Sequence, residues 1–379
     1  MHFLDYETLR VVWWLLLGVL LIGFAVMDGF DLGTGILLPF VGRTDSERRI
    51  AINAVGPVWE GNQVWLILGA GAIFAAWPAV YAVAFSGFYL AMFLVLCSLI
   101  LRPVGFKYRS KMPGERWRSV WDWLLFLGGF IPALIFGVAV GNALHGAPFH
   151  FDDSLRMTYE GDLIGLLNPY AVLCGLVSVA MLVMHGGAYL AAKAAEPVAG
   201  RARRATLLGA VVLILLFALA GVWTSASEGY RITGTLAHDG PSNPLGKTAE
   251  HAAGAWLANY GSMPWTLLAP VLGFAGALLA AGLSRTKRDG LAWIASALAV
   301  AGVVATAGVS MFPFILPSSL NASSSLTVWD ASSSRTTLLV MLVAAVIFVP
   351  IILAYTAFVY RALRGRVTAQ QVEADHSSY

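Results

Sequence analysis

The feature that most constrains this chain is the length of its uncharged apolar runs. Residues 64–101 form a stretch of 38 residues without Asp, Glu, Lys or Arg. A helix that crosses a bilayer needs about 20 mostly apolar residues, so this run is too long for one crossing. The Trp77-Pro78 step is the natural place for a break, because proline disfavours helix at the residue before it. The run therefore predicts two membrane-crossing helices.

Similar runs fill the rest of the chain, which has 379 residues and is 58% hydrophobic and 12% charged. A soluble domain has roughly 25% charged residues, so lipid must cover much of this apolar surface. We therefore predict an all-α polytopic membrane protein with about nine transmembrane helices. The predicted spans are residues 11–39, 51–76, 78–101, 123–143, 166–191, 206–225, 265–283, 291–312 and 336–360.

The basic residues predict the orientation of these spans. Cytoplasmic loops of membrane proteins are enriched in Lys and Arg. With nine spans, alternate connecting segments hold 19 of the 24 basic residues and the remaining segments hold five. This places the N-terminus outside and the C-terminus inside. We interpret residues 1–366 as a single helical transmembrane domain and residues 367–379 as a short polar cytoplasmic tail that we expect to fray.

Three carboxylates fall within predicted spans, where charge is costly. Asp28 and Asp31 lie three positions apart and so share a helix face, and Glu60 interrupts the second span beside Asn62 and Gln63. By the predicted orientation all three lie toward the cytoplasm. Carboxylates inside a membrane mark proton or ion paths by default, whereas a position near the lipid headgroups would explain them as ordinary helix-end residues. We take the three as candidates for a proton pathway.

Other residues near these carboxylates have two open interpretations. Trp59 and Trp65 flank Glu60, and they either shape a pocket or belong to an aromatic belt at the membrane interface. Arg102 ends the third span and Asp122 begins the fourth, and each is either an interfacial anchor or an ion-pair partner.

The sequence offers little for a redox centre or a metal site. Haem iron in a helical bundle is usually held by His, Met, Cys or Tyr, and among seven histidines only His185 falls well inside a predicted span. We interpret His185 as a hydrogen-bonded packing residue and predict that this chain ligates neither haem nor metal. Cys97 and Cys174 lie in apolar stretches, which argues against a disulfide. No Lys/Arg-rich run is interleaved with aromatic residues, so nucleic acid is not an expected partner.

Several long motifs have compositions that are unusual for lipid-facing helices. They are GFDLG in the first span, WEGNQVWL in the second, LRPVGFKYRSK after the third, and later WDWLLFLGGFIPALIFGVAVGN, LLNPYAVLCGL, GAWL, MFPFILPSS and SLTVWDASSS. Together they resemble subunit II of the bacterial cytochrome bd quinol oxidases, and the resemblance runs from about residue 3 to the C-terminus. Some members of that family have Asp where this chain has Glu60, which conserves a carboxylate.

The resemblance implies a multi-pass subunit of a quinol:oxygen oxidoreductase of the aerobic respiratory chain, in the bacterial inner membrane. In that family subunit I carries two b-type haems and one d-type haem and oxidises quinol, and oxygen is reduced to water with protons from the cytoplasm. Subunit II packs against subunit I, supports its assembly and contributes to proton uptake. The resemblance leaves open whether the complex contains a small single-helix accessory subunit and whether this chain binds a quinone or a lipid.

On this resemblance we expect Glu60 to be the key acid of an uptake path at the interface with subunit I, with Asp28 and Asp31 nearer its mouth. The competing idea is that the carboxylates pair with Arg102, or with a basic group on subunit I, and only fix assembly. Two other classes of function are an ion-coupled transporter and a purely structural scaffold without a proton role. A transporter would favour broken helices in two corresponding halves, whereas the acidic residues here cluster in the first two spans.

The orientation can be tested with a reporter fused after Arg366. Because most basic residues lie in the loops assigned to the inside, we expect a reporter that works only in the cytoplasm to be active there. Activity of an export-dependent reporter at the same position would rule out the nine-span topology.

Overall fold

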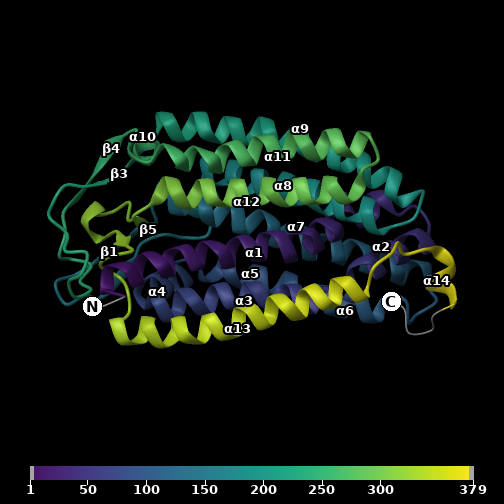
Figure 1. The fold of residues 1–379 in the computed structure, drawn as a ribbon, viewed down its shortest axis with the longest axis horizontal. Helices are drawn as coiled ribbons and strands as arrows, with labels where there is room; N and C mark the ends of the chain where they lie inside the picture. The colour runs from purple at the N-terminus through teal and green to yellow at the C-terminus, as the bar shows by residue number, and fades with distance from the viewer. Residues whose placement is uncertain (1–3, 375–379) are drawn as a thin grey trace.

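The computed structural model describes residues 4–374 and is a bundle of long helices that run side by side (Figure 1). Within the described residues, eight helical segments are long and apolar enough to cross a membrane. They are Tyr6–Val41 (α1), Tyr89–Lys111, Glu115–His145 (α7), Pro169–Lys193 (α8), Val198–Ala226 (α9), Pro264–Arg285, Asp289–Met311 (α12) and Arg335–Ala362 (α13). The segment Pro264–Arg285 contains α11 (Leu268–Arg285). The prediction of an all-α polytopic membrane protein is confirmed.

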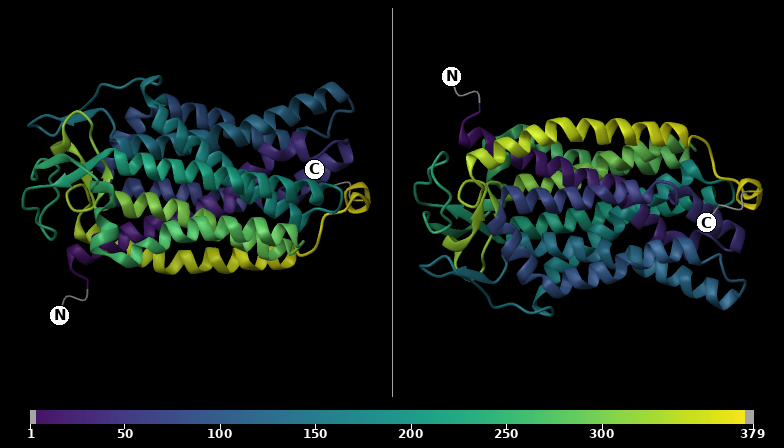
Figure 2. Two further views of the ribbon diagram at one scale, coloured as in Figure 1. Left: turned by 90° about the horizontal axis from the view of Figure 1, so that it is seen from above. Right: turned by 90° about the horizontal axis from the view of Figure 1, so that it is seen from below.

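A further helix, α3 (Trp59–Ala76), runs alongside these segments and would make the ninth crossing (Figure 1). It is more polar than the others because Glu60, Asn62 and Gln63 all lie in its first two turns. The start of α1 and the end of α13 lie at opposite ends of the bundle, as an odd number of crossings requires (Figure 2).

The prediction of one helix over residues 51–76 is wrong. The chain forms α2 (Asp45–Val55), turns over residues 56–58, and begins α3 at Trp59. Pro57 lies in this turn, where it lacks a backbone donor and disfavours helix at the preceding residue. The break places Glu60 in the first turn of α3 rather than in the middle of a span.

The break predicted at the Trp77-Pro78 step is confirmed, since α3 ends at Ala76 and α4 begins at Pro78. The third crossing is built from three short helices that follow one another closely. They are α4 (Pro78–Gly87), α5 (Tyr89–Leu99) and α6 (Leu101–Tyr108).

Local sequence signals set where several long helices begin. Asp5 caps α1 by accepting the backbone N–H of Thr8 at 2.7 Å, and its hydrogen bonds with Thr8 hold the pKa of the Asp5 carboxyl below its usual value. Asn168 caps α8 ahead of Pro169, and Ser334 caps α13. Such caps satisfy backbone donors that the first turn of a helix leaves unpaired.

α1 is the helix around which the others pack, and it contacts α3, α7, α8 and α12. The backbones of α1 and α8 come closest at Gly33 and Gly186, where a methyl group added to Gly33 would strike the carbonyl of Leu182. Small residues permit this close approach between helices in a membrane. The C-terminal half of α1 is therefore covered by protein on most sides, and Asp28 and Asp31 are buried.

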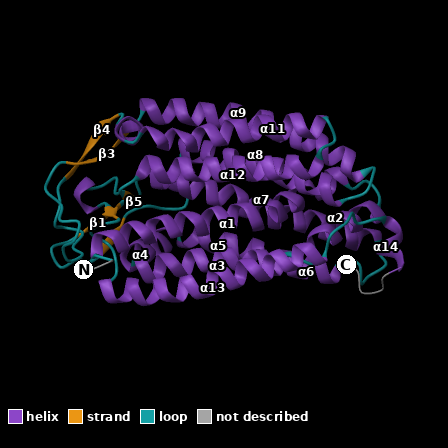
Figure 3. Ribbon diagram, in the orientation of Figure 1, coloured by secondary structure: helices purple, strands orange, loops and turns teal. Residues whose placement is uncertain are grey.

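Three short antiparallel hairpins and the short helix α10 (Ala258–Ser262) gather at one end of the bundle (Figure 3). The hairpins pair β1 (Phe149–Phe151) with β2 (Met157–Tyr159), β3 (Glu228–Ile232) with β4 (Ala249–Ala253), and β5 (Phe314–Leu316) with β6 (Leu326–Thr327). All three lie in loops that the basic residues predict to be outside.

A buried ion pair fastens this end. The Lys247 ammonium lies 2.6 Å from a carboxylate oxygen of Asp330, and both side chains are fully buried. Burial lowers the pKa of Lys247, and the charge of Asp330 opposes that shift. Nearby, the Arg10 guanidinium of α1 donates to the hydroxyl of Ser332 and to the carbonyl of His238. These contacts join the start of α1 to two loops that are distant in sequence.

The expectation that the tail frays is wrong for its described part. Residues Ala369–Ala374 form α14, which packs against α2, and the backbone N–H of Val367 donates to the carbonyl of Lys193. Val372 is only 2% exposed. The buried Val372 side chain and these hydrogen bonds hold the short helix on the bundle.

Candidate functional site

Two of the predicted carboxylates meet Arg102 inside the bundle. Asp28 of α1 accepts two hydrogen bonds from the Arg102 guanidinium of α6, at 2.6 and 3.1 Å. The side chains are 0% and 2% exposed. This forked geometry is the strong form of the arginine–carboxylate pair, and removing either partner would leave a buried charge uncompensated. Arg102, which the sequence left open as an interfacial anchor or an ion-pair partner, is therefore an ion-pair partner.

Asp31 lies one turn further along α1 and is held more loosely. Its Oδ2 accepts a hydrogen bond from the side-chain amide of Asn62 at 2.8 Å and lies 3.9 Å from the Arg102 guanidinium. Its other oxygen, Oδ1, is buried and has no hydrogen-bond partner among the described residues. One guanidinium thus faces two carboxylates, and its contact with Asp31 is the longer and weaker of the two.

Asn62 links this pair of carboxylates to the last long helix. Its side-chain oxygen accepts a hydrogen bond from the hydroxyl of Tyr360 on α13 at 2.9 Å. Sequence reasoning missed Tyr360, because a tyrosine near the end of an apolar span has the same pattern as an interfacial anchor. Only packing of α13 beside α3 brings its hydroxyl to Asn62.

Glu60 and Gln63 lie apart from this cluster. Glu60 is exposed at the surface of the chain and Gln63 is half-buried. Within residues 4–374 neither side chain makes a hydrogen bond or an ion pair. Asn62, between them in sequence, points inward to Asp31, so successive residues of α3 face in different directions.

Trp59 and Trp65 are buried, at 5% and 4% exposure, so within this chain both rings pack inside the bundle. The Trp59 ring packs on Phe106 of α6, with ring centroids 5.6 Å apart, and Trp65 lies against Gly23 of α1. Both indole N–H groups are without a partner among the described residues.

His185 of α8 is fully buried between α1 and α12. Its Nε2 lies 2.8 Å from the carbonyl oxygen of Val26, and its Nδ1 lies 2.7 Å from the hydroxyl of Ser296. A carbonyl oxygen can only accept, so Nε2 carries the proton toward Val26. Both ring nitrogens are thus engaged within the chain. Among the described residues no group of three or more His, Cys, Asp or Glu side chains is arranged to hold a metal ion.

Asp122, at the start of the fourth span, also forms ion pairs. Its carboxylate contacts the guanidinium groups of Arg109 at 2.5 Å and of Arg48 at 2.7 Å. These contacts tie α2, α6 and α7 together at the end of the bundle opposite the hairpins.

Comparison with known proteins identifies the family. Residues 9–363 match the family described as cytochrome bd terminal oxidase subunit II. The chain belongs to this family. It is 52% identical over 377 residues to a probable cytochrome oxidase subunit 2 of Haemophilus influenzae, covering 99% of this chain and 100% of the relative. It is 50% identical over 378 residues to cytochrome bd-I ubiquinol oxidase subunit 2 of Escherichia coli K12, with the same coverage.

Two more distant comparisons agree with this membership. A cytochrome bd ubiquinol oxidase subunit 2 of Bacillus subtilis is 31% identical over 365 residues, covering 96% of this chain and 98% of the relative. The structure of bd oxidase from Geobacillus thermodenitrificans matches with a TM-score of 0.65 at 18% identity, covering 94% of this chain and 98% of the other. At that identity the match shows the fold alone.

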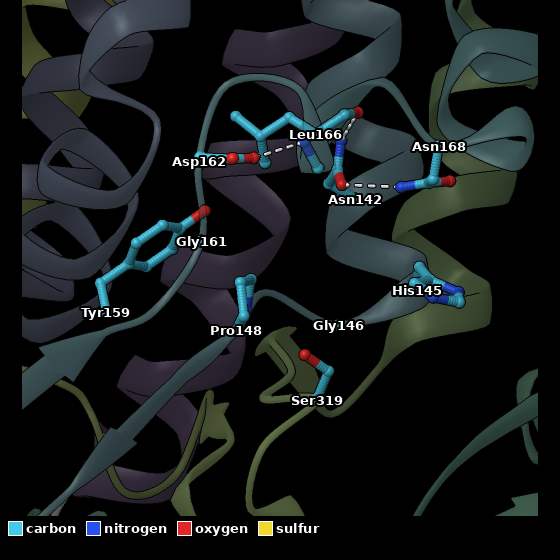
Figure 4. Close-up of a pocket in the computed structure, with 11 residues that line it drawn as sticks. Asn142, His145, Gly146, Pro148, Tyr159, Gly161, Asp162, Leu166, Asn168 and Ser319 are labelled. Carbon is cyan, nitrogen blue, oxygen red and sulfur yellow. Dashed lines mark hydrogen bonds between the residues drawn. The ribbon is translucent and has the colours of Figure 1, made fainter.

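This subunit II also contains a cavity of about 190 Å³ beside the hairpins (Figure 4). Asn142 donates to the carbonyl of Leu166 at 2.8 Å and accepts from the amide of Asn168 at 3.0 Å at its rim. Tyr159 and Asp162 lie on the other side, and burial raises the pKa of Tyr159 to about 12. The cavity lies at the end of the bundle where the hairpins gather, whereas Asp28 and Asp31 lie in the other half of α1.

We expect Asp28 and Asp31 to differ in their contribution to the stability of this subunit II. Asp28→Asn would leave the buried Arg102 charge with only Asp31 at 3.9 Å, at a cost of roughly 3–5 kcal/mol. Asp31→Asn keeps the Asp28–Arg102 pair and serves as the matched control, with a smaller cost. Thermal unfolding of the detergent-purified protein measures the difference. Equal stability of the two variants would contradict this division.

Proposed function

We propose that this chain is subunit II of a membrane-bound quinol:oxygen oxidoreductase in the bacterial cytoplasmic membrane. The observation that carries the proposal is 50% identity over 99% of the chain to a relative named as a subunit of cytochrome bd-I ubiquinol oxidase. The relatives in Haemophilus influenzae and Bacillus subtilis have names of the same kind, which favours an oxidase over an ion-coupled transporter.

Affinity purification through a tag on this chain tests the proposal. We expect a haem-carrying subunit I to copurify, together with quinol-dependent oxygen consumption and the absorption bands of two b-type haems and one d-type haem. A stable, haem-free preparation that catalyses ion transport would overturn the proposal in favour of the transporter.

The haems of this oxidase are assigned to subunit I because this chain does not fit them. The deep histidine, His185, has both ring nitrogens engaged by Val26 and Ser296. An axial ligand needs a free nitrogen lone pair aimed at the iron. We therefore assign no electron-transfer step to the residues of this chain. Its contribution is to pack against subunit I, to support its assembly and to deliver protons.

Large apolar surfaces are available for subunit I and for lipid. On α13, only 6% of the residues in the most apolar stretch are buried within the chain. Exposed apolar side chains also cover one face of α5, namely Tyr89, Leu90, Phe93, Leu94 and Leu96. No described residue argues for a separate contact with a small accessory subunit or with quinol, so we assign none.

For proton delivery we propose that Glu60 is the exchangeable acid at the surface that subunit I covers. Glu60 is exposed on this chain and makes no hydrogen bond or ion pair within residues 4–374, so its carboxylate is available to a partner. A carboxylate at a subunit interface can exchange protons with water and with side chains of the partner.

Asp28, Asp31 and Asn62 take different parts in this proposal. Asp28 is committed to Arg102 and acts as a fixed counter-ion. Asp31 has one open oxygen and is the second group able to take up a proton. Asn62 cannot pass a proton onward, because its amide nitrogen only donates and its oxygen only accepts, so it orients Asp31.

Glu60→Gln distinguishes a proton role from a purely structural scaffold. The amide keeps the size and hydrogen bonding of the side chain but cannot exchange a proton. We expect a fully assembled complex with normal haem content and at least severalfold slower oxygen consumption. Glu115→Gln, an exposed carboxylate in the first turn of α7, is the matched control and should turn over normally. Full assembly of Glu60→Gln with the wild-type rate at every pH would support the scaffold.

The assignment of haem to the partner predicts a limited effect of His185→Gln. Glutamine can still hydrogen-bond but is a poor haem ligand, so the packing around Val26 and Ser296 should weaken while all haem bands persist. The absorption spectrum of the purified complex checks this. Selective loss of one haem, with both subunits present in equal amounts, would show that His185 is a ligand.

A further inference from the structure

A second cavity, of about 240 Å³, lies at the inner end of the bundle. Its walls come from the turn between α2 and α3, the end of α8, and the segment that joins α13 to α14, elements that meet at one end of Figure 1. Three of the lining residues are basic, namely Lys193, Arg364 and Arg366, and no carboxylate lines it. The cavity is therefore a region of positive charge.

The positive charge of this cavity is only partly neutralised by its surroundings. The Arg366 guanidinium contacts Asp289 at 2.8 Å, but Asp289 is also bound by Arg203 at 2.8 Å. Arg203 in turn pairs with Glu196, so these four residues balance one another. Lys193 and Arg364 have no ion-pair partner within residues 4–374 and contribute two uncompensated charges.

Lys193 is also held in place by the backbone around the cavity. Its ammonium donates to the carbonyl oxygens of Leu363, at 2.5 Å, and Gly365, at 3.3 Å. These bonds fix the segment that follows α13, where Gly365 adopts a φ of +110° that favours glycine. An ammonium has three donors, so one donor stays available for a ligand. Arg364, next to Gly365, is exposed at the same rim.

The helix α13, whose last residue Ala362 lines the cavity, has an exposed apolar face. Along α13, Ile351, Tyr355 and Phe358 are 57%, 64% and 69% exposed. A ligand with a negative headgroup and hydrocarbon chains would match both the positive charge of the cavity and the apolar face of α13. Free phosphate would match only the positive charge. Basic pockets between helices at the cytoplasmic side of a membrane bind anionic lipid headgroups in this way.

We propose that this cavity is a binding site for an anionic phospholipid. The phosphate lies between Lys193 and Arg364, and the acyl chains follow the exposed face of α13. The site is independent of the oxidase assignment, since it rests on the cavity, its charges and the apolar surface beside it. It would anchor the end of α13, the helix whose Tyr360 both lines the cavity and hydrogen-bonds Asn62.

Native mass spectrometry of the detergent-purified, full-length chain with its copurifying partner tests the proposal. The probes are dioctanoyl phosphatidylglycerol, dioctanoyl phosphatidylcholine and inorganic phosphate. We expect phosphatidylglycerol to bind more tightly than either other probe, with an affinity that falls as salt rises. Arg364→Gln should weaken it roughly fivefold and Arg364→Glu further, because one basic residue near a lipid surface contributes about that factor.

Two further variants complete the design. Lys193→Gln combined with Arg364→Gln should weaken phosphatidylglycerol binding by roughly 25-fold. Arg285→Gln combined with Arg288→Gln removes two exposed charges from the same end of the bundle but outside the cavity, and should leave binding unchanged. Because Lys193 also holds backbone carbonyls, the Arg364 variants decide the result if the double variant does not assemble.

Three results would overturn the proposal. Equal binding of phosphatidylcholine would show that charge is not recognised. Displacement of phosphatidylglycerol by an equal concentration of inorganic phosphate would identify a free-anion site instead. Wild-type affinity in Arg364→Glu, or an absence of binding because the partner covers the cavity, would show that this cavity is not a lipid site.

Discussion

The buried ion pair between Asp28 and Arg102 is the contact around which the half of the bundle opposite the hairpins is arranged. Either charge would be energetically costly if buried alone, and the forked hydrogen bonds between the two groups offset the cost of burying both. Because Asp28 lies on α1 and Arg102 on α6, the pair fixes the depth of the third crossing relative to the first. The close contact of α1 with α8 at Gly33 and Gly186 then leaves little room for α1 to shift.

This pair also explains why Asp31 has a different character from Asp28. A single guanidinium cannot make forked contacts with both carboxylates, so Asp31 relies on Asn62 and keeps one oxygen open. The difference arises from geometry, since both residues are buried on the same helix face. We therefore propose that Asp28 maintains structure and that Asp31 is the carboxylate able to exchange a proton.

The two ends of the bundle are stabilised by different means. At the hairpin end, the Lys247–Asp330 pair and the hydrogen bonds of Arg10 join loops that are far apart in sequence. At the opposite end, Asp122 and Asp289 each bind two arginines and thereby tie helix ends together. Both ends therefore use ion pairs to join segments that are distant in sequence.

The sequence alone was sufficient for the fold class, the approximate spans and the family, because hydrocarbon imposes a fixed length of apolar helix and because motifs such as GFDLG are local. It also marked Asp28, Asp31 and Glu60 as unusual, since charge in an apolar run is visible in one dimension. The sequence could not determine which way each side chain points or which residues it contacts. The turn at Pro57, the outward position of Glu60, the inward position of Asn62 and the contact with Tyr360 depend on how α3 rotates against α1 and α13. Only tertiary packing sets that rotation, because α3 has apolar residues on all sides and so no periodic pattern that selects one face.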